Sequence, residues 1–139
     1  MSEETFYHVG LAVTDIDAAM RELSAARGLT WAKVTALTIE GHPLKFTYSV
    51  EGPPHIELIE GESGGPWDAS GGSHTHHVGL FTSDLKGDRA RVEEAGMKLD
   101  LAGRGFTYHW GALSGVRLEL VAEGTRPAFE RWLAGGDFI

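Results

Sequence analysis

His-Val-Gly-Leu occurs twice in this chain, in HVGLAVTDID at residues 8–17 and in HVGLFTSDL at residues 77–85. Each copy runs on to a hydroxyl residue followed by an aspartate. A second phrase is also repeated, as IELI at residues 56–59 and LELV at residues 118–121. Each copy of the pattern therefore has a histidine near its start and a glutamate near its end. Such a repeat indicates that the fold consists of two related modules.

The residues around each copy predict the same order of elements: a strand, a helix and three more strands. Alternating apolar residues and turn residues delimit the strands, which we predict at residues 6–13, 31–39, 44–50 and 55–60, and again at 76–81, 97–102, 106–110 and 116–121. Apolar residues at helical spacing predict helices at residues 15–27 and 84–95, each followed by a glycine. We therefore predict an α+β fold, in which two tandem βαβββ modules form a curved eight-stranded sheet around a cleft for a metal ion and a substrate.

The length of the chain suits one domain covering residues 1–139. The two modules would occupy about residues 5–60 and 76–123, joined by a Gly/Ser-rich linker at residues 61–75 and followed by a short C-terminal helix at residues 126–134. The sequence leaves open whether the modules pair within one chain or exchange between the two chains of a homodimer.

The composition excludes several classes of protein. The chain has no cysteine, so it has no disulfide framework, no thiolate metal site and no cysteine nucleophile. Its formal net charge of −8 argues against nucleic acid or an anionic membrane as a partner, since both require basic patches. No signal peptide or membrane span is recognisable, so we expect a cytoplasmic protein whose partner is a small molecule.

Strand parity brings four polar residues to one face of the predicted sheet. Side chains alternate between the faces of a strand, and the aliphatic residues of the repeated strands share the face that we expect to pack under the helices. The opposite face then carries two histidines and two glutamates: His8, Glu57, His77 and Glu119. His76 competes with His77 as a ligand, but parity places His76 on the aliphatic face and favours His77. Two imidazoles and two carboxylates suit Zn, Ni, Co, Mn or Fe as a divalent ion, with two positions left open.

These residues resemble the vicinal oxygen chelate superfamily, which includes glyoxalase I, methylmalonyl-CoA epimerase, extradiol dioxygenases and bleomycin-resistance proteins. The resemblance rests on the repeated HVGL-to-Asp phrase, the paired IELI and LELV strands and the duplicated order of elements. It implies metal ligands at His8, Glu57, His77 and Glu119. The epimerase relatives also place a catalytic carboxylate before the third strand of the first module, where Glu40 fits if a one-residue gap is allowed.

The resemblance implies a divalent-metal-dependent isomerase, epimerase or lyase that acts on a small substrate with vicinal oxygens. A metal ion would stabilise the enediolate formed when a proton leaves the carbon beside a carbonyl, and a nearby carboxylate would take that proton. The candidates for this base are Glu57, Glu119 and Glu40. Two alternatives stay open. One is a metal-free protein that sequesters an aromatic small molecule, and the other is an extradiol-type dioxygenase, which would use His8, His77 and Glu119 as its ligands.

Other side chains are undecided between the site and the core. The aromatic residues of two strands would either line an apolar substrate pocket or fill the core: Phe46, Tyr48, Phe106, Tyr108 and Trp110. Arg104 either faces an anionic substrate group or is a solvated turn residue. We expect the remaining histidines to be surface or loop residues: His42, His55, His74 and His109.

Overall fold

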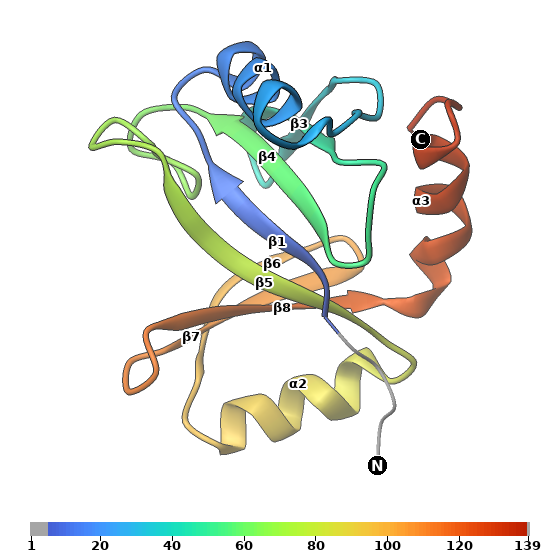
Figure 1. Cartoon of the computed structure of the whole chain (residues 1–139). Coiled ribbons are helices and arrows are strands. Elements are labelled where there is room, and N and C mark those ends of the chain that lie inside the picture. Colours follow the sequence, from blue (N-terminus) through green and yellow to red (C-terminus); the bar gives the residue numbers. More distant parts are fainter. Residues whose placement is uncertain (1–5, 139) are drawn as a thin grey trace.

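The fold is that of a computed structural model, which describes residues 6–138. Within these residues the chain forms an eight-stranded mixed sheet, curled into a half-barrel, with three α-helices packed around it (Figure 1). The strands are β1 (Phe6–Ala12), β2 (Thr35–Ile39), β3 (His42–Tyr48), β4 (His55–Gly61), β5 (His74–Thr82), β6 (Lys98–Gly103), β7 (Phe106–Gly111) and β8 (Val116–Ala122). The helices are α1 (Ile16–Arg27), α2 (Leu85–Glu94) and α3 (Arg126–Leu133), the last preceded by a 3-10 turn, η1 (Glu123–Thr125).

The two modules join along their first strands. The strand order is β2-β3-β4-β1-β5-β8-β7-β6, so each module contributes four neighbouring strands. At the centre β1 runs antiparallel to β5, while β1 with β4 and β5 with β8 are parallel pairs. The predicted α+β fold of two tandem βαβββ modules in a curved eight-stranded sheet is confirmed. In this structure of a single chain, the first strands of the two modules pair with each other.

Both module helices begin at the aspartate of the repeated phrase. The side chain of Asp15 accepts a hydrogen bond from the backbone N–H of Ala18 at 3.0 Å, and that of Asp84 accepts one from Gly87 at 3.0 Å. Such N-caps satisfy backbone donors that would otherwise have no partner in the first turn. α1 ends at Gly28, whose φ of 70° is the left-handed conformation typical of a helix stop.

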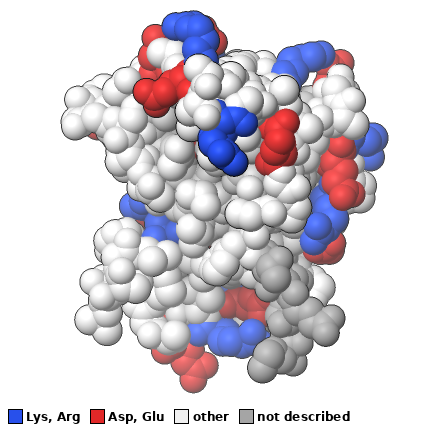
Figure 2. All heavy atoms as spheres, viewed as in Figure 1, with Lys and Arg blue, Asp and Glu red and all other residues white. Residues whose placement is uncertain are grey.

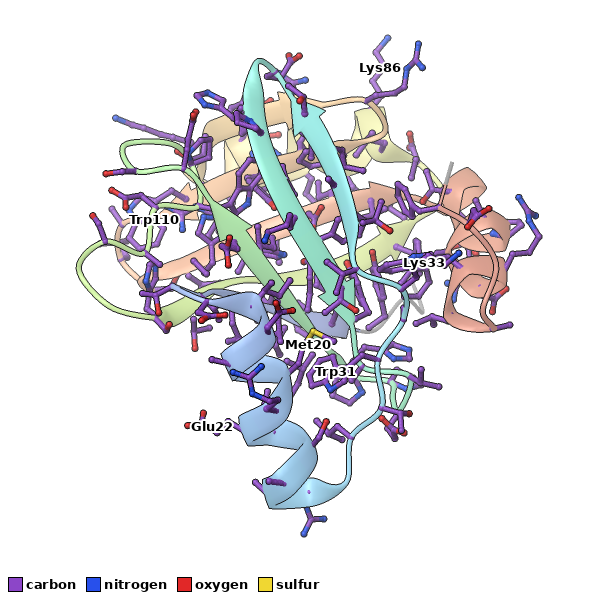
Figure 3. The ribbon with its side chains drawn as sticks, turned by 90° about the horizontal axis from the view of Figure 1, so that it is seen from above. Met20, Glu22, Trp31, Lys33, Lys86 and Trp110 are labelled. Atoms are coloured by element: carbon purple, nitrogen blue, oxygen red, sulfur yellow. The ribbon has the colours of Figure 1, made fainter. Side chains whose placement is uncertain are left out.

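The outer face of the sheet is aliphatic and lies under α1 and α2. Ile16 of α1 is 1% exposed and packs with Val13 and Leu58 of the sheet. Figure 3 shows Met20 on the side of α1 that faces the sheet, whereas Glu22 points away from it. By contrast α2 has no buried residue, so the second module covers its outer face less tightly.

The inner face of the sheet is largely aromatic, and α3 packs against the part that belongs to the first module. Trp132 is fully buried, its ring lies 4.9 Å from that of Phe46, and its indole N–H donates to the backbone oxygen of Lys33 at 3.2 Å. Phe129 lies 4.9 Å from Tyr48, measured between ring centroids. These contacts tie the C-terminal helix to β3, which pairs with β4 in the first module.

One strand starts later than its sequence pattern predicts. We predicted a strand over residues 31–39, but β2 begins only at Thr35, and Trp31 makes a single isolated bridge to Ser49. The Trp31 indole N–H donates instead to Ser24 Oγ of α1 at 2.9 Å. Tertiary packing against the helix therefore outweighs the strand preference of the aromatic residue.

The surface shows no single-sign field on the face drawn in Figure 2, where lysine and arginine side chains alternate with aspartate and glutamate. Among the described residues, arginine and lysine side chains form ion pairs with nearby carboxylates, such as Arg126 with Glu123. No helix among residues 6–138 is long and apolar enough to cross a membrane.

Candidate metal centre

Four side chains from four adjacent strands meet on the inner face of the sheet. They are His8 of β1, Glu57 of β4, His77 of β5 and Glu119 of β8. One ligand atom of each lies within 4.8 Å of the corresponding atom of every other, and all four residues are buried. The two histidines are 0% and 2% exposed, and the two glutamates 7% and 8%. The structure thus brings together the four residues that strand parity placed on one face.

The distances within this cluster match those between neighbouring ligands of one metal ion. The Nε2 atoms of His8 and His77 lie 2.9 Å apart. Glu119 Oε1 lies 2.9 Å from His8 Nε2 and 3.1 Å from His77 Nε2. Glu57 Oε1 lies 3.0 Å from His77 Nε2 and 3.4 Å from His8 Nε2. Two ligands at right angles, each about 2.1 Å from a divalent ion, would lie about 3.0 Å apart.

An unpaired buried oxygen supports the same interpretation. Glu119 Oε1 is buried and accepts no hydrogen bond of good geometry from residues 6–138, although a buried carboxylate oxygen normally has a donor or a cation. Two imidazole nitrogens and two carboxylates are also a donor set that Zn, Ni, Co, Mn and Fe accept. The residues present therefore fit a divalent metal ion.

The cluster is electrostatically built to hold positive charge. Burial alone would lower the pKa of His77, but the close contacts and negative charges of Glu119 and Glu57 outweigh it and raise that pKa to about 9. The pKa of His8 is raised for the same reasons. Burial would raise the pKa of Glu119, yet His77 and His8 bring it down to about 2, and they also lower the pKa of Glu57. Two buried carboxylates thus require a compensating charge, which protons or a metal ion can supply.

Two glycines of the repeated phrase make room for the ligands. Gly10 pairs with His77 across β1 and β5, and a Cβ atom at Gly10 would lie 2.1 Å from Cε1 of that imidazole. Gly79 pairs with His8 in the same way, again with 2.1 Å to Cε1. Each glycine therefore accommodates the histidine of the other module. This explains why the phrase is His-x-Gly in both copies.

Two tyrosines flank the cluster, and the sequence pattern left both undecided between a substrate pocket and the core. Tyr48 pairs with Glu57 across β3 and β4, and Tyr108 pairs with Glu119 across β7 and β8. The Tyr48 ring lies 5.1 Å from that of His8, and the Tyr108 ring 4.9 Å from that of His77. The signal in the sequence was a tyrosine in the strand before each repeated glutamate. Of the other aromatics left undecided, Phe46 is in the core and Trp110 is 39% exposed.

The prediction that His76 lies on the aliphatic face is wrong. The register between β1 and β5 shifts between the pairs Gly10–His77 and Leu11–Thr75, which makes His76 the extra residue of a β-bulge. Alternation fails across a bulge, so His76 is only 5% exposed and its ring lies 5.4 Å from that of Tyr108 on the inner face. His77 is nevertheless the residue that enters the cluster.

Two of the histidines expected at the surface are buried instead. The His55 ring packs against Phe129 of α3, with its Nδ1 atom 2.8 Å from the backbone oxygen of Ser49. His109 is 0% exposed and its Nε2 atom lies 2.9 Å from Thr107 Oγ1. Neither residue enters the four-residue cluster. A sequence pattern cannot show that a polar residue is buried when its partner is a backbone oxygen or a hydroxyl on its own sheet.

Glu40, the third candidate base, and Arg104 lie away from the cluster. Glu40 is exposed in the turn between β2 and β3, with a φ of 49°. β3 follows this turn and pairs with β4, with Leu44 opposite Gly61 and Tyr48 opposite Glu57. The turn therefore lies beyond the end of β4 that is farther from Glu57. The structure therefore does not bring Glu40 to the other candidate residues. Arg104 is exposed in the turn before β7.

Comparison with known proteins agrees with this geometry. A family model described as the Glyoxalase/Bleomycin resistance protein/Dioxygenase superfamily matches residues 7–113, and the chain belongs to that superfamily. No curated protein matches the chain.

Solved structures of the same fold include two epimerases. The methylmalonyl-CoA epimerase of Mycobacterium tuberculosis is 19% identical with a TM-score of 0.67, over 89% of this chain and 91% of that one. A variant of the Streptomyces coelicolor methylmalonyl-CoA epimerase, solved with 2-nitronate-propionyl-CoA, is 22% identical with a TM-score of 0.62, over 84% of this chain and 95% of that one. A mutant 4-hydroxymandelate synthase from Streptomyces coelicolor is 11% identical with a TM-score of 0.63, over 86% of this chain and 48% of that one. At these identities the likeness shows the fold alone.

Proposed function

We propose that this protein is a divalent-metal-dependent isomerase, epimerase or lyase of the glyoxalase type, acting on a small substrate with vicinal oxygens. The observation that carries the proposal is the presence of Glu57 in the cluster beside His8, His77 and Glu119. A site with two histidines and one glutamate is enough for a ring-cleaving iron dioxygenase. A fourth ligand that brings a second negative charge favours proton-transfer chemistry without a change in the oxidation state of the metal.

The bound metal would act as a Lewis acid that stabilises negative charge on the substrate oxygens as a proton leaves the neighbouring carbon. The protein itself would supply the ligands, a base and a site from which water is largely excluded. The side chains of Glu57 and Glu119 are each only 10% exposed, and fixed charges act more strongly where water is excluded.

Glu57 is the better base of the two buried carboxylates. Glu119 makes the shorter contact to His8, and its pKa is lowered to about 2, so it holds a proton poorly. Glu57 makes its longer contact to the same histidine, at 3.4 Å. Both carboxylates contact His77 at nearly the same distance, 3.0 Å for Glu57 and 3.1 Å for Glu119, so it is the weaker contact to His8 that leaves Glu57 freer to approach a substrate carbon and accept its proton. Glu40, exposed in its turn, would need a large movement of the β2–β3 hairpin to act there.

The experiment is hydrogen exchange in heavy water. Protein loaded with Zn, Ni, Co, Mn or Fe is incubated with a panel of small 2-hydroxy and 2-oxo carbonyl compounds, and deuterium at the carbon beside the carbonyl is followed by NMR. We expect metal-dependent exchange with at least one compound, and its loss in Glu57→Gln measured at saturating metal. Oxygen uptake by the iron form without exchange would instead support the dioxygenase alternative. Metal-loaded protein that binds aromatic compounds but exchanges no proton would support the sequestering alternative.

A further inference from the structure

The two histidines of the cluster are held differently, although their modules repeat one another. In both modules the residue before the histidine is the extra residue of a β-bulge and turns to the inner face: Tyr7 before His8, and His76 before His77. The Tyr7 ring packs 4.4 Å from that of His8, but His8 Nδ1 is buried and has no hydrogen-bond partner in the part of the chain that the structure describes. The Nδ1 atom of His77 has one, because His76 Nδ1 lies 2.9 Å away.

His76 is itself fixed from three sides. Its Nε2 atom lies 2.8 Å from the backbone oxygen of Pro66, in the segment between the modules. Its own backbone oxygen accepts a hydrogen bond of 3.0 Å from Nη1 of Arg117. Its ring packs edge-on against Tyr108, whose hydroxyl accepts a hydrogen bond of 3.1 Å from the indole of Trp67. A side chain held at this many points has one available orientation.

Donors and acceptors can be assigned along the series of hydrogen bonds from Pro66 through His76 to His77, because some of these atoms can only accept. The Pro66 carbonyl only accepts, so Nε2 of His76 must carry a hydrogen and donate it. In a neutral His76 the Nδ1 atom is then bare and accepts, which requires His77 to carry its hydrogen on Nδ1. When the cluster gives up its shared protons to a metal ion, the Nε2 atom of His77 is thereby left with its lone pair directed at the cluster, which is the form that a metal requires.

We propose that His76 is a positioning residue that holds His77 in the Nδ1–H tautomer and so prepares one ligand of the cluster in advance. The proposal rests on the metal site of the proposed function. Partners of this kind, which bind the far nitrogen of a metal-ligating histidine, fix the orientation of the ring and raise its basicity. Module two thus presents a prepared ligand, whereas the far nitrogen of His8 in module one has no such partner among the described residues.

The first test reads the tautomers without any metal. Long-range ¹⁵N–¹H correlation spectra of the metal-free protein should show His76 as a neutral ring with its hydrogen on Nε2 and an accepting Nδ1. Spectra of zinc-loaded protein should show His77 with its hydrogen on Nδ1. A neutral His76 that carries its hydrogen on Nδ1 overturns the proposal whether or not the protein binds metal.

The second test measures zinc affinity by calorimetry in three variants. His76→Phe keeps the bulk but removes the acceptor, and zinc should bind about 10- to 100-fold more weakly. His76→Gln retains an acceptor and a donor and should restore most of the affinity. His109→Phe is the control, since His109 is equally buried but its ring contacts Thr107. Wild-type affinity in His76→Phe, or an equal loss in His109→Phe, overturns the proposal. If the wild-type protein binds none of Zn, Ni, Co, Mn and Fe, the proposed function fails, and the tautomer of His76 still decides whether His76 is a positioning residue.

Discussion

The two modules of this chain are alike on the inner face of the sheet and unlike on the outer face. The inner face repeats four pairs of residues: His8 with His77, Gly10 with Gly79, Tyr48 with Tyr108, and Glu57 with Glu119. On the outer face α1 has 12 residues and buries Ile16, whereas α2 has 10 residues and buries none. A helix need only cover apolar surface, and many sequences do so. A shared four-residue centre needs both halves to deliver the same groups at the same place.

The largest expected effect comes from breaking the close approach of the two halves. Gly10→Ala and Gly79→Ala each place a Cβ atom 2.1 Å from the imidazole of the opposite module, and the ring must move. We expect each variant to lose more metal affinity than the 10- to 100-fold that loss of an outer hydrogen-bond partner costs, so more than about 100-fold. Calorimetric metal titration measures this.

Gly71→Ala is the matched control for both glycine variants, because a Cβ there meets nothing within 4 Å. It should bind metal like the wild type. An effect in only one of the two site variants would show that the halves are not equivalent at the cluster.

A second effect sharpens the contrast between the outer faces. Ile16 and Leu85 follow the capping aspartates of α1 and α2 and so occupy equivalent places, but Ile16 is 1% exposed and Leu85 is half-buried. Ile16→Ala should lower the free energy of unfolding by about 2–5 kcal/mol. Leu85→Ala should cost clearly less, because its side chain leaves a smaller cavity. Denaturant unfolding of the metal-free variants measures both, and equal losses would contradict the difference in packing.

The third expected effect is a dependence of stability on pH that metal removes. The pKa of His77 is raised to about 9. It therefore contributes stability that is present below pH 6.5, the ordinary pKa of histidine, and is lost as the pH rises through 9. The pKa of Glu119 is lowered to about 2. It therefore contributes stability that is present above pH 4.5, the ordinary pKa of glutamate, and is lost as the pH falls through 2. Metal-free protein should therefore melt at a lower temperature at pH 9 than at pH 6.

Metal-loaded protein should not show this fall between pH 6 and pH 9, since the ion replaces the shared protons. Thermal melts with and without chelator at the two pH values decide the point. Parallel pH profiles for the two forms would mean that the histidines do not titrate as part of the cluster.

The smallest effect concerns a feature that both modules share outside the site. Asp15→Ala and Asp84→Ala each remove one N-cap hydrogen bond, and each should cost about 1 kcal/mol in the free energy of unfolding. Metal affinity should stay unchanged in both, as measured by the same titration. A loss of metal binding in either variant would show that the helices position the cluster, which the account assigns to the strands.

The sequence predicted the fold and the cluster because both depend on regular alternation. His8 and Glu57 reach one face by counting residues along strands, and the internal repeat confirms the count in the second module. His76 could not be placed, because a bulge adds one residue without any mark in the sequence. Burial of His55 and His109 was missed because their partners are a backbone oxygen and a hydroxyl on the same sheet. These contacts exist only once the strands have paired.

The tyrosines were accessible to the same reasoning but needed the pairing of strands. Tyr48 and Tyr108 stand opposite the two glutamates, and this register follows from the turns between the strands rather than from alternation within one strand. Their equivalence in the two modules was visible in the sequence as a tyrosine before each repeated glutamate. The resemblance implied roles for the four ligands and for Glu40 but none for these tyrosines, so they stayed undecided between the site and the core.

The measurement that tests the central claim most directly is metal titration of wild-type protein beside Glu57→Gln and Glu119→Gln. If the four residues form one centre, wild-type protein takes up one divalent ion per chain. The two carboxylate variants then lose affinity to a similar extent, because each removes one charge from the same shell. Wild-type protein that takes up no ion would contradict the claim. So would unchanged affinity in Glu57→Gln beside a large loss in Glu119→Gln, which would leave a three-ligand site.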